Sequence, residues 1–165
     1  MSKVRVDIDT AVIDAQVRAA STEALNVSFL ALSRLVRTKL SQRGTGRFYK
    51  VAIGRKNGRN LRAQGYHQAS APGFPPAVNT NRLRASFISD QLGTWKYGYA
   101  YIKQAAKRTA LNFGSRVFYA PMLEFGTRKM QPRPYLRPNL KVFSGGVERI
   151  FAKAFERHFP SRKNP

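Results

Sequence analysis

Residues 10–43, TAVIDAQVRAASTEALNVSFLALSRLVRTKLSQR, decide the fold, because no glycine or proline interrupts them. Apolar and small residues recur along this stretch at spacings of three and four: Ile13, Val17, Ala20, Ala24, Val27, Ala31 and Leu35. This period predicts one amphipathic helix of about 30 residues, roughly 45 Å long. Its apolar stripe requires a cover, which is either the protein's own sheet or a neighbouring subunit.

The segments on both sides of this helix differ sharply in character. Before it, Val4, Val6 and Ile8 alternate with charged residues, which predicts a short strand with one buried face. After it, residues 44–82 are rich in Gly, Pro and Arg and include a candidate strand from Phe48 to Ile53. Asn57-Gly58 favours a tight turn, so residues 55–62 are predicted to form the tip of a basic hairpin or arm. The run ASAPGFPPA (69–77) is predicted to be extended, because proline disfavours helix.

The second half of the chain predicts strands and then a helix. Three segments have strand character: Leu83–Ser89, Thr94–Ile102 and Thr109–Phe118. In the middle one, four aromatic residues from Trp95 to Tyr101 alternate onto one face, which favours packing under the long helix over a nucleotide-stacking platform. Residues 138–159 predict a C-terminal helix that begins at Pro138, with Leu140 and Phe143 on its apolar face.

These elements predict a single α+β domain in which a long N-terminal helix and a C-terminal helix pack on a small antiparallel sheet. Residues 1–43 supply a strand and the long helix, and residues 44–82 supply an extended basic Pro/Gly-rich arm and loop. Residues 83–137 supply antiparallel strands and a strap, 138–159 the C-terminal helix, and 160–165 a frayed tail.

Charge is the strongest compositional signal. Thirty Lys and Arg against eight Asp and Glu give a net charge of +22, and no acid occurs between Ala24 and Ser89. Such a field favours a polyanionic neighbour, either nucleic acid or an acidic protein surface. The candidates for contact with DNA or an acidic partner are Arg47, Lys50, Arg55, Lys56, Arg59, Arg62, Arg82 and Arg84.

The patterns that indicate an enzyme are missing from the sequence. It has no cysteine, and neither His67 nor His158 stands at metal-ligand spacing from another ligand. The eight acids are too dispersed for paired carboxylate chemistry or a magnesium site. We therefore expect no catalysis and no cofactor. The sequence also lacks a secretory signal and an apolar run of about 18 residues, which predicts synthesis in the cytoplasm and no membrane contact.

Residues 119–140, YAPMLEFGTRKMQPRPYLRPNL, place one carboxylate, Glu124, in an apolar run. We expect Glu124 to bind a guanidinium, because a partly buried carboxylate is costly without a partner. Gly126 allows a bend. The segment KMQPRPYLRP (129–138) is predicted to form an extended strap, which its three prolines stiffen and which Tyr135 and Leu136 anchor. The strap either closes the core over the last helix or docks on a neighbour. The docking candidates are Glu124, Phe125, Gly126, Thr127, Arg133, Pro134, Tyr135, Leu136, Arg137 and Pro138.

Together with YHQASAPGFPPAVNTNRLRASF (66–87), this stretch resembles the neck or tail-completion (head–tail joining) proteins of long-tailed double-stranded DNA bacteriophages and prophages. The matching residues of the second motif are Tyr119, Ala120, Glu124, Phe125, Gly126, Thr127, Arg133, Pro134, Leu136, Arg137 and Pro138. Those of the first are Ser70, Pro72, Gly73, Pro75, Pro76, Thr80 and Leu83. The sequence departs from the family pattern at Asn81, where glycine is usual, and at Phe74, where an acid is common.

The resemblance implies a non-catalytic virion protein, made in the bacterial host and assembled as a ring at the head–tail junction, with DNA passing through. The implied partners are other copies of the chain, head-completion or connector proteins, and tail-terminator or tail-tube proteins. The long helix and the strap are candidates for the two faces by which ring subunits meet. The alternative is a free-standing, sequence-nonspecific nucleic-acid-binding protein, which the charge and the aromatic strand favour.

Overall fold

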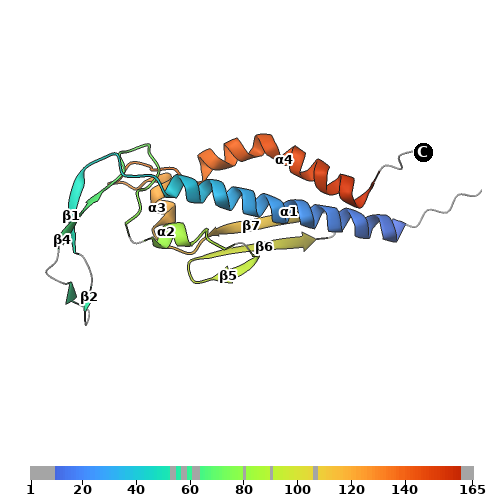
Figure 1. Cartoon of the computed structure of the whole chain (residues 1–165), viewed down its shortest axis with the longest axis horizontal. Helices are drawn as coiled ribbons and strands as arrows, with labels where there is room; N and C mark the ends of the chain where they lie inside the picture. Colours follow the sequence, from blue (N-terminus) through green and yellow to red (C-terminus); the bar gives the residue numbers. More distant parts are fainter. Residues whose placement is uncertain are drawn as a thin grey trace, which may run out of the picture.

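The computed structural model describes residues 10–52, 55–56, 59–60, 64–79, 81–89, 91–105 and 108–160. Helix α1 (Thr10–Leu40) lies between helix α4 (Arg137–His158) and an antiparallel sheet of β5 (Gly93–Trp95), β6 (Gly98–Ala105) and β7 (Arg108–Ser115) (Figure 1). The predicted α+β class, both long helices and the small antiparallel sheet are thereby confirmed. The predicted strand at Val4, Val6 and Ile8 lies outside the described residues.

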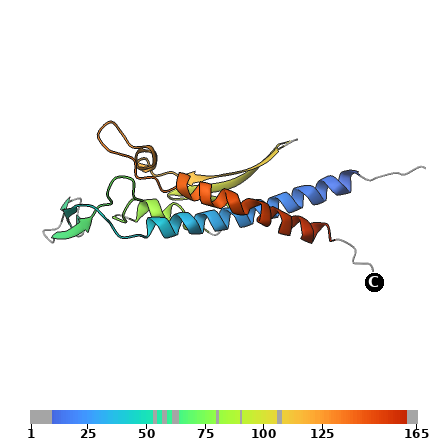
Figure 2. The ribbon, with the colours of Figure 1, turned by 90° about the horizontal axis from the view of Figure 1, so that it is seen from above.

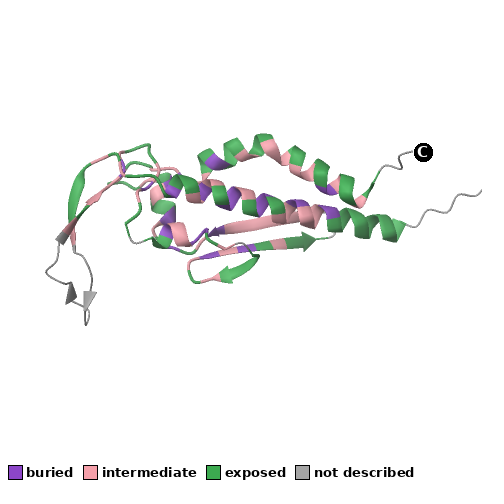
Figure 3. Ribbon diagram, viewed as in Figure 1, coloured by how far each residue is buried: buried purple, intermediate pink, exposed green. Residues whose placement is uncertain are grey.

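Helix α1 buries a band of residues that is wider than the predicted stripe. Its buried residues are Ala20, Ala24, Ser28, Phe29, Leu32, Ser33, Val36 and Leu40. The predicted stripe is confirmed only at Ala20 and Ala24, because Ile13, Val17 and Val27 are exposed and Ala31 and Leu35 are only half-buried. The physical reason is that α1 is covered on two sides, by α4 and by the sheet (Figure 3). Its first turns, by contrast, are exposed.

The aromatic strand predicted at Thr94–Ile102 is in fact a hairpin. A turn at Lys96 and Tyr97 separates β5 from β6, so that Trp95 pairs with Gly98. Trp95 faces α1, where its ring lies 6.5 Å from that of Phe29. Tyr99 and Tyr101 lie on the opposite face from the fully buried Ala100, and Tyr101 is 49% exposed. The prediction that one row of aromatics packs under the helix is therefore wrong, because the turn reverses the chain within that row.

The strand predicted at Leu83–Ser89 is also wrong. The chain there forms α2 (Arg82–Ala85), a single helical turn, which places Leu83 and Phe87 in the core. Asn81 precedes it in the left-handed conformation, with φ 61°. Asparagine tolerates this conformation better than most residues, which accounts for asparagine at this position. Two apolar residues four apart fit a helical turn as well as a strand.

The arm is built from short antiparallel pairs. Strand β1 (Phe48–Ala52) pairs with β4 (Gln64–Gln68), and β2 (Arg55–Lys56) pairs with β3 (Arg59–Asn60). The β1–β4 ribbon extends away from the helices at the end where α1 finishes (Figures 1 and 2). The predicted turn at Asn57-Gly58 lies outside the described residues. None of the described helices combines the length and apolarity needed to cross a membrane.

The core lies at the C-terminal end of α1. Leu32, Val36 and Leu40 pack there with Leu83 and Phe87, with Val117, and with Ala120 of α3 (Ala120–Phe125) and Tyr135. Helix α3 was not predicted, because residues 83–137 were expected to form only antiparallel strands and the strap. Helix α4 begins beside this core and runs back along α1, but its predicted core residue Leu140 is exposed and Asn139 is buried instead.

Candidate docking site at the base of the arm

Glu124 caps the N-terminus of α4. Its side chain is buried, and its carboxylate accepts the backbone N–H groups of Tyr135 and Leu136 at 2.9 Å each and of Arg137 at 2.8 Å. These N–H groups lie at the start of α4 and have no partner within the helix, so the carboxylate satisfies them. The predicted guanidinium partner is confirmed as Arg137, whose Nε lies 3.3 Å from Oε1. The backbone cap was not predicted, since the capping residue is 13 positions upstream of the helix start.

Two opposing effects act on the pKa of Glu124. Burial raises it, but the hydrogen bonds from Tyr135, Leu136 and Arg137 outweigh burial and hold the pKa below its ordinary value of 4.5. A carboxylate with a lowered folded-state pKa stabilises the fold above the unfolded-state pKa and loses that contribution as the pH falls through the folded-state value.

We therefore expect the free energy of unfolding to fall as the pH drops below 4.5, as Glu124 becomes protonated. Denaturant unfolding across a series of acidic buffers measures this. Glu23 provides the control, because its pKa is also lowered, by Arg157 and His158, but its side chain is only half-buried. Glu23→Gln should retain most of the acid sensitivity, and a Glu23→Gln variant that loses it would contradict the assignment to Glu124.

The bend predicted at Gly126 is confirmed, and it forms a tight turn together with Thr127. Gly126 has φ 79°, and a Cβ there would lie 2.8 Å from the carbonyl oxygen of Met130. Thr127 pairs with Met130 through both backbone groups, and its Oγ1 accepts the N–H of Lys129. This turn sends the chain back along α3, so that the N–H of Arg133 donates to Leu123 at 2.7 Å.

The two sequence motifs meet in space. Arg133 Nε donates to the carbonyl oxygen of Ser70 at 3.0 Å, and the N–H of Gly73 donates to that of Pro132 at 3.0 Å. The proline loop is in turn bound to the start of the arm, where Gly46 N–H donates to Ala69 at 2.7 Å. Strap, loop and arm base therefore form one hydrogen-bonded unit.

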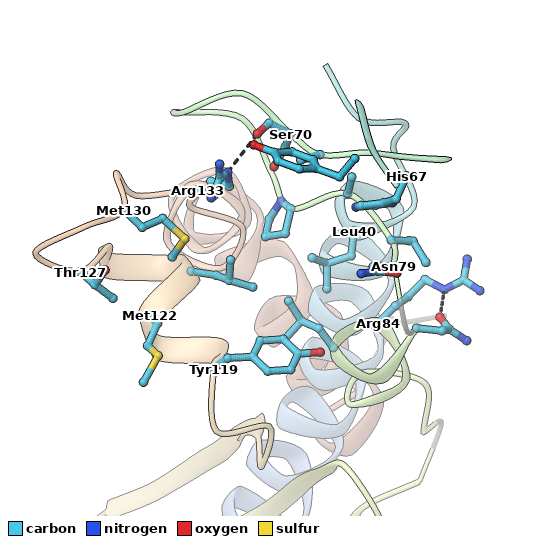
Figure 4. Close-up of a pocket in the computed structure, with 18 residues that line it drawn as sticks. Leu40, His67, Ser70, Asn79, Arg84, Tyr119, Met122, Thr127, Met130 and Arg133 are labelled. Atoms are coloured by element: carbon cyan, nitrogen blue, oxygen red, sulfur yellow. Dashed lines mark hydrogen bonds between the residues drawn. The ribbon is translucent and has the colours of Figure 1, made fainter. Parts of the chain in front are cut away.

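A largely apolar cavity of about 650 Å³ lies within this unit (Figure 4). Its walls come from the end of α1, the arm, the proline loop, α2, α3 and the strap, and include Leu40, Tyr49, Val78, Leu83, Met122 and Met130. Ligand-binding cavities commonly have this size and an apolar lining with a few polar groups. No sequence signal identified the cavity, because its lining residues come from six separate segments.

The lining of the cavity is basic. Arg84, Arg133 and His67 line it, and no acid belongs to the lining. Arg84 Nε donates to Asn81 Oδ1 at 2.7 Å, and neither arginine forms a salt bridge with any carboxylate in the described part of the chain. Large exposed apolar side chains occur on the same arm, loop and α3 segments: Phe48, Tyr49, Tyr66, Phe74, Met122 and Phe125. The surface thus combines apolar area with uncompensated positive charge.

The predicted docking residues divide into an internal and an exposed group. Glu124 and Tyr135 are buried inside the subunit, so their side chains stabilise the fold and are not available to a partner. Phe125 is 63% exposed, and the guanidinium of Arg137 lies 4.7 Å from its ring centroid. The remaining members are half-buried or exposed along the strap and the start of α4: Gly126, Thr127, Arg133, Pro134, Leu136 and Pro138.

The predicted basic contacts are placed in part. Arg84 lines the cavity, Arg82 is exposed on α2, and Arg47 and Lys50 are exposed on the arm. For Arg55, Lys56 and Arg59 only the backbone of β2 and β3 is described, and Arg62 lies outside the described residues. Within the described ranges, no group of three or more histidines and acids is placed to hold a metal ion.

Comparison of the chain with protein-family models, with curated proteins and with solved structures found no match.

Proposed function

We propose that the protein is a structural component of a bacteriophage neck, which assembles as a ring and joins the tail to the DNA-filled head. The observation that carries the proposal is the contact between the two motifs that resemble neck and tail-completion proteins. Arg133 and Ser70, one from each motif, are hydrogen-bonded, and an open apolar cavity adjoins them. Two segments that are hydrogen-bonded to each other beside an open apolar cavity form a surface suited to bind a neighbouring protein.

Surface chemistry supports a role in assembly. Exposed apolar patches on a protein surface mark interaction sites, and the apolar side chains around the cavity form such a surface. The charge of +22 suits either DNA passing through a ring or acidic faces on adjoining head and tail proteins. Phosphate contacts carry no sequence information, so basic residues facing the lumen would not select particular DNA. The proposal assigns no reaction and no cofactor to the chain.

Deletion of this gene alone from its phage tests the proposal. We expect electron microscopy of the lysate to find DNA-filled heads lying apart from complete tails, because the joining component is missing. Complementation with the intact gene is the control and should restore joined virions. Intact virions in the deletion lysate would contradict the proposal.

One observation favours the alternative of nonspecific nucleic-acid binding. Tyr99 and Tyr101 lie on the uncovered face of the sheet with ring centroids 6.0 Å apart, and Lys103 is exposed on the same strand face. Bases stack on such aromatic side chains, and nearby cations bind phosphates. This function predicts tight binding by an isolated monomer with a steep dependence on salt.

A further inference from the structure

We propose that the cavity at the base of the arm receives residues 4–9 of a second copy of the chain. This contact rests on the proposed ring function, and it specifies which surfaces of adjacent subunits meet. It would join the segment before α1 of one subunit to the opposite end of the next.

The apolar pattern of this segment matches the cavity. Val4, Val6 and Ile8 alternate along the sequence, so an extended chain presents all three on one face. The cavity offers apolar walls from Leu40, Val78, Leu83, Met122 and Met130, and about 650 Å³ of volume. Three aliphatic side chains would thus bury apolar surface on both subunits.

The charges are also complementary. In an extended segment, Asp7 and Asp9 lie on the face opposite the aliphatic residues, together with Arg5. Arg84 and Arg133 lie on different sides of the cavity (Figure 4) and meet no carboxylate in the part of the chain that the structure describes. Residues 6–9 form the one stretch of the sequence in which two acids alternate with aliphatic residues. No other segment of this chain offers the same chemistry.

Geometry excludes the same contact within one subunit. Helix α1 has 31 residues and is therefore about 46 Å long. Thr10 lies at one end of the molecule, and Leu40 lines the cavity at the other (Figures 1 and 2). Six fully extended residues span only about 20 Å, so residues 4–9 cannot return to their own cavity. A contact between two different surfaces is head-to-tail, and such contacts close into rings when the rotation allows.

Engineered cysteines test the contact in the full chain, which contains no cysteine of its own. The variant Ile8→Cys/Met122→Cys should form a reducible ladder of dimers, trimers and larger species on mild oxidation. Met122 suits this test because it lines the cavity and is partly exposed. The matched control is Ile8→Cys/Val142→Cys, since Val142 is exposed on α4 and does not belong to the cavity lining.

Charge removal gives a second readout on the same variant. Adding Asp7→Asn and Asp9→Asn should reduce cross-linking by about fivefold, as expected for two exposed ion pairs. Cross-linking no greater than in the Val142 control would overturn the docking, and the cavity would then be assigned to a different protein. That result would not decide the proposed function, because the deletion lysate measures head–tail joining independently of this contact. Cross-linking combined with intact virions in the deletion lysate would support the docking and reject the neck function.

Discussion

Glu124→Ala is expected to lower the free energy of unfolding by about 3 kcal/mol and to reduce the yield of soluble protein. The substitution removes the acceptor for the backbone N–H groups of Tyr135, Leu136 and Arg137 at the buried start of α4. Hydrogen bonds to a charged group stabilise more than neutral ones, and buried donors without a partner incur a desolvation cost. The arginine that remains is largely exposed and adds little to this loss.

Denaturant unfolding of the purified variant measures this loss. Glu148→Ala is the matched control, because Glu148 is an exposed acid on α4, the helix that Glu124 caps. Its removal should change the free energy of unfolding by less than about 0.5 kcal/mol. Glu124→Gln keeps the shape of the side chain but loses the charge, so an intermediate loss is expected. If Glu124→Ala unfolds like Glu148→Ala, the carboxylate does not hold the start of α4.

Features with a strong local signal could be predicted from the sequence. The uninterrupted run at residues 10–43 gave α1 because periodic apolar positions without glycine or proline leave few alternatives. Gly126 was predicted to allow a bend, and it has a positive φ. The guanidinium partner of Glu124 could be expected because a buried carboxylate requires a counter-charge.

Features decided by tertiary structure could not be predicted in this way. Leu83 and Phe87 suit either a strand or a helical turn, and the contacts of Phe87 with the core select the turn. The chain reverses at Lys96 and Tyr97, and neither residue is a glycine or a proline. The alternation of aromatic residues across this turn therefore predicted one continuous strand. The cavity depends on the antiparallel return of the strap along α3, which only the folded chain reveals.

Phe87→Ala is expected to lower the free energy of unfolding by about 3–5 kcal/mol, the usual range for a buried phenylalanine. Phe87 is 1% exposed, and its ring lies 5.4 Å from Phe113 of the sheet and 6.0 Å from Tyr135 at the end of the strap. It therefore joins α2, the sheet and the strap in one aromatic cluster. Removing the ring should leave a cavity and loosen the wall that α2 gives to the docking site.

Phe118→Ala separates this structural effect from an effect on assembly. Phe118 is 78% exposed, so its truncation should change the free energy of unfolding by less than about 0.5 kcal/mol. Denaturant unfolding measures the stability of both variants, and light scattering measures self-association at a temperature where both are folded. Equal losses of stability would contradict the placement of Phe87 in the core. A folded Phe118→Ala variant that fails to self-associate would add this exposed ring to the assembly surface, because no loss of folding would account for the defect.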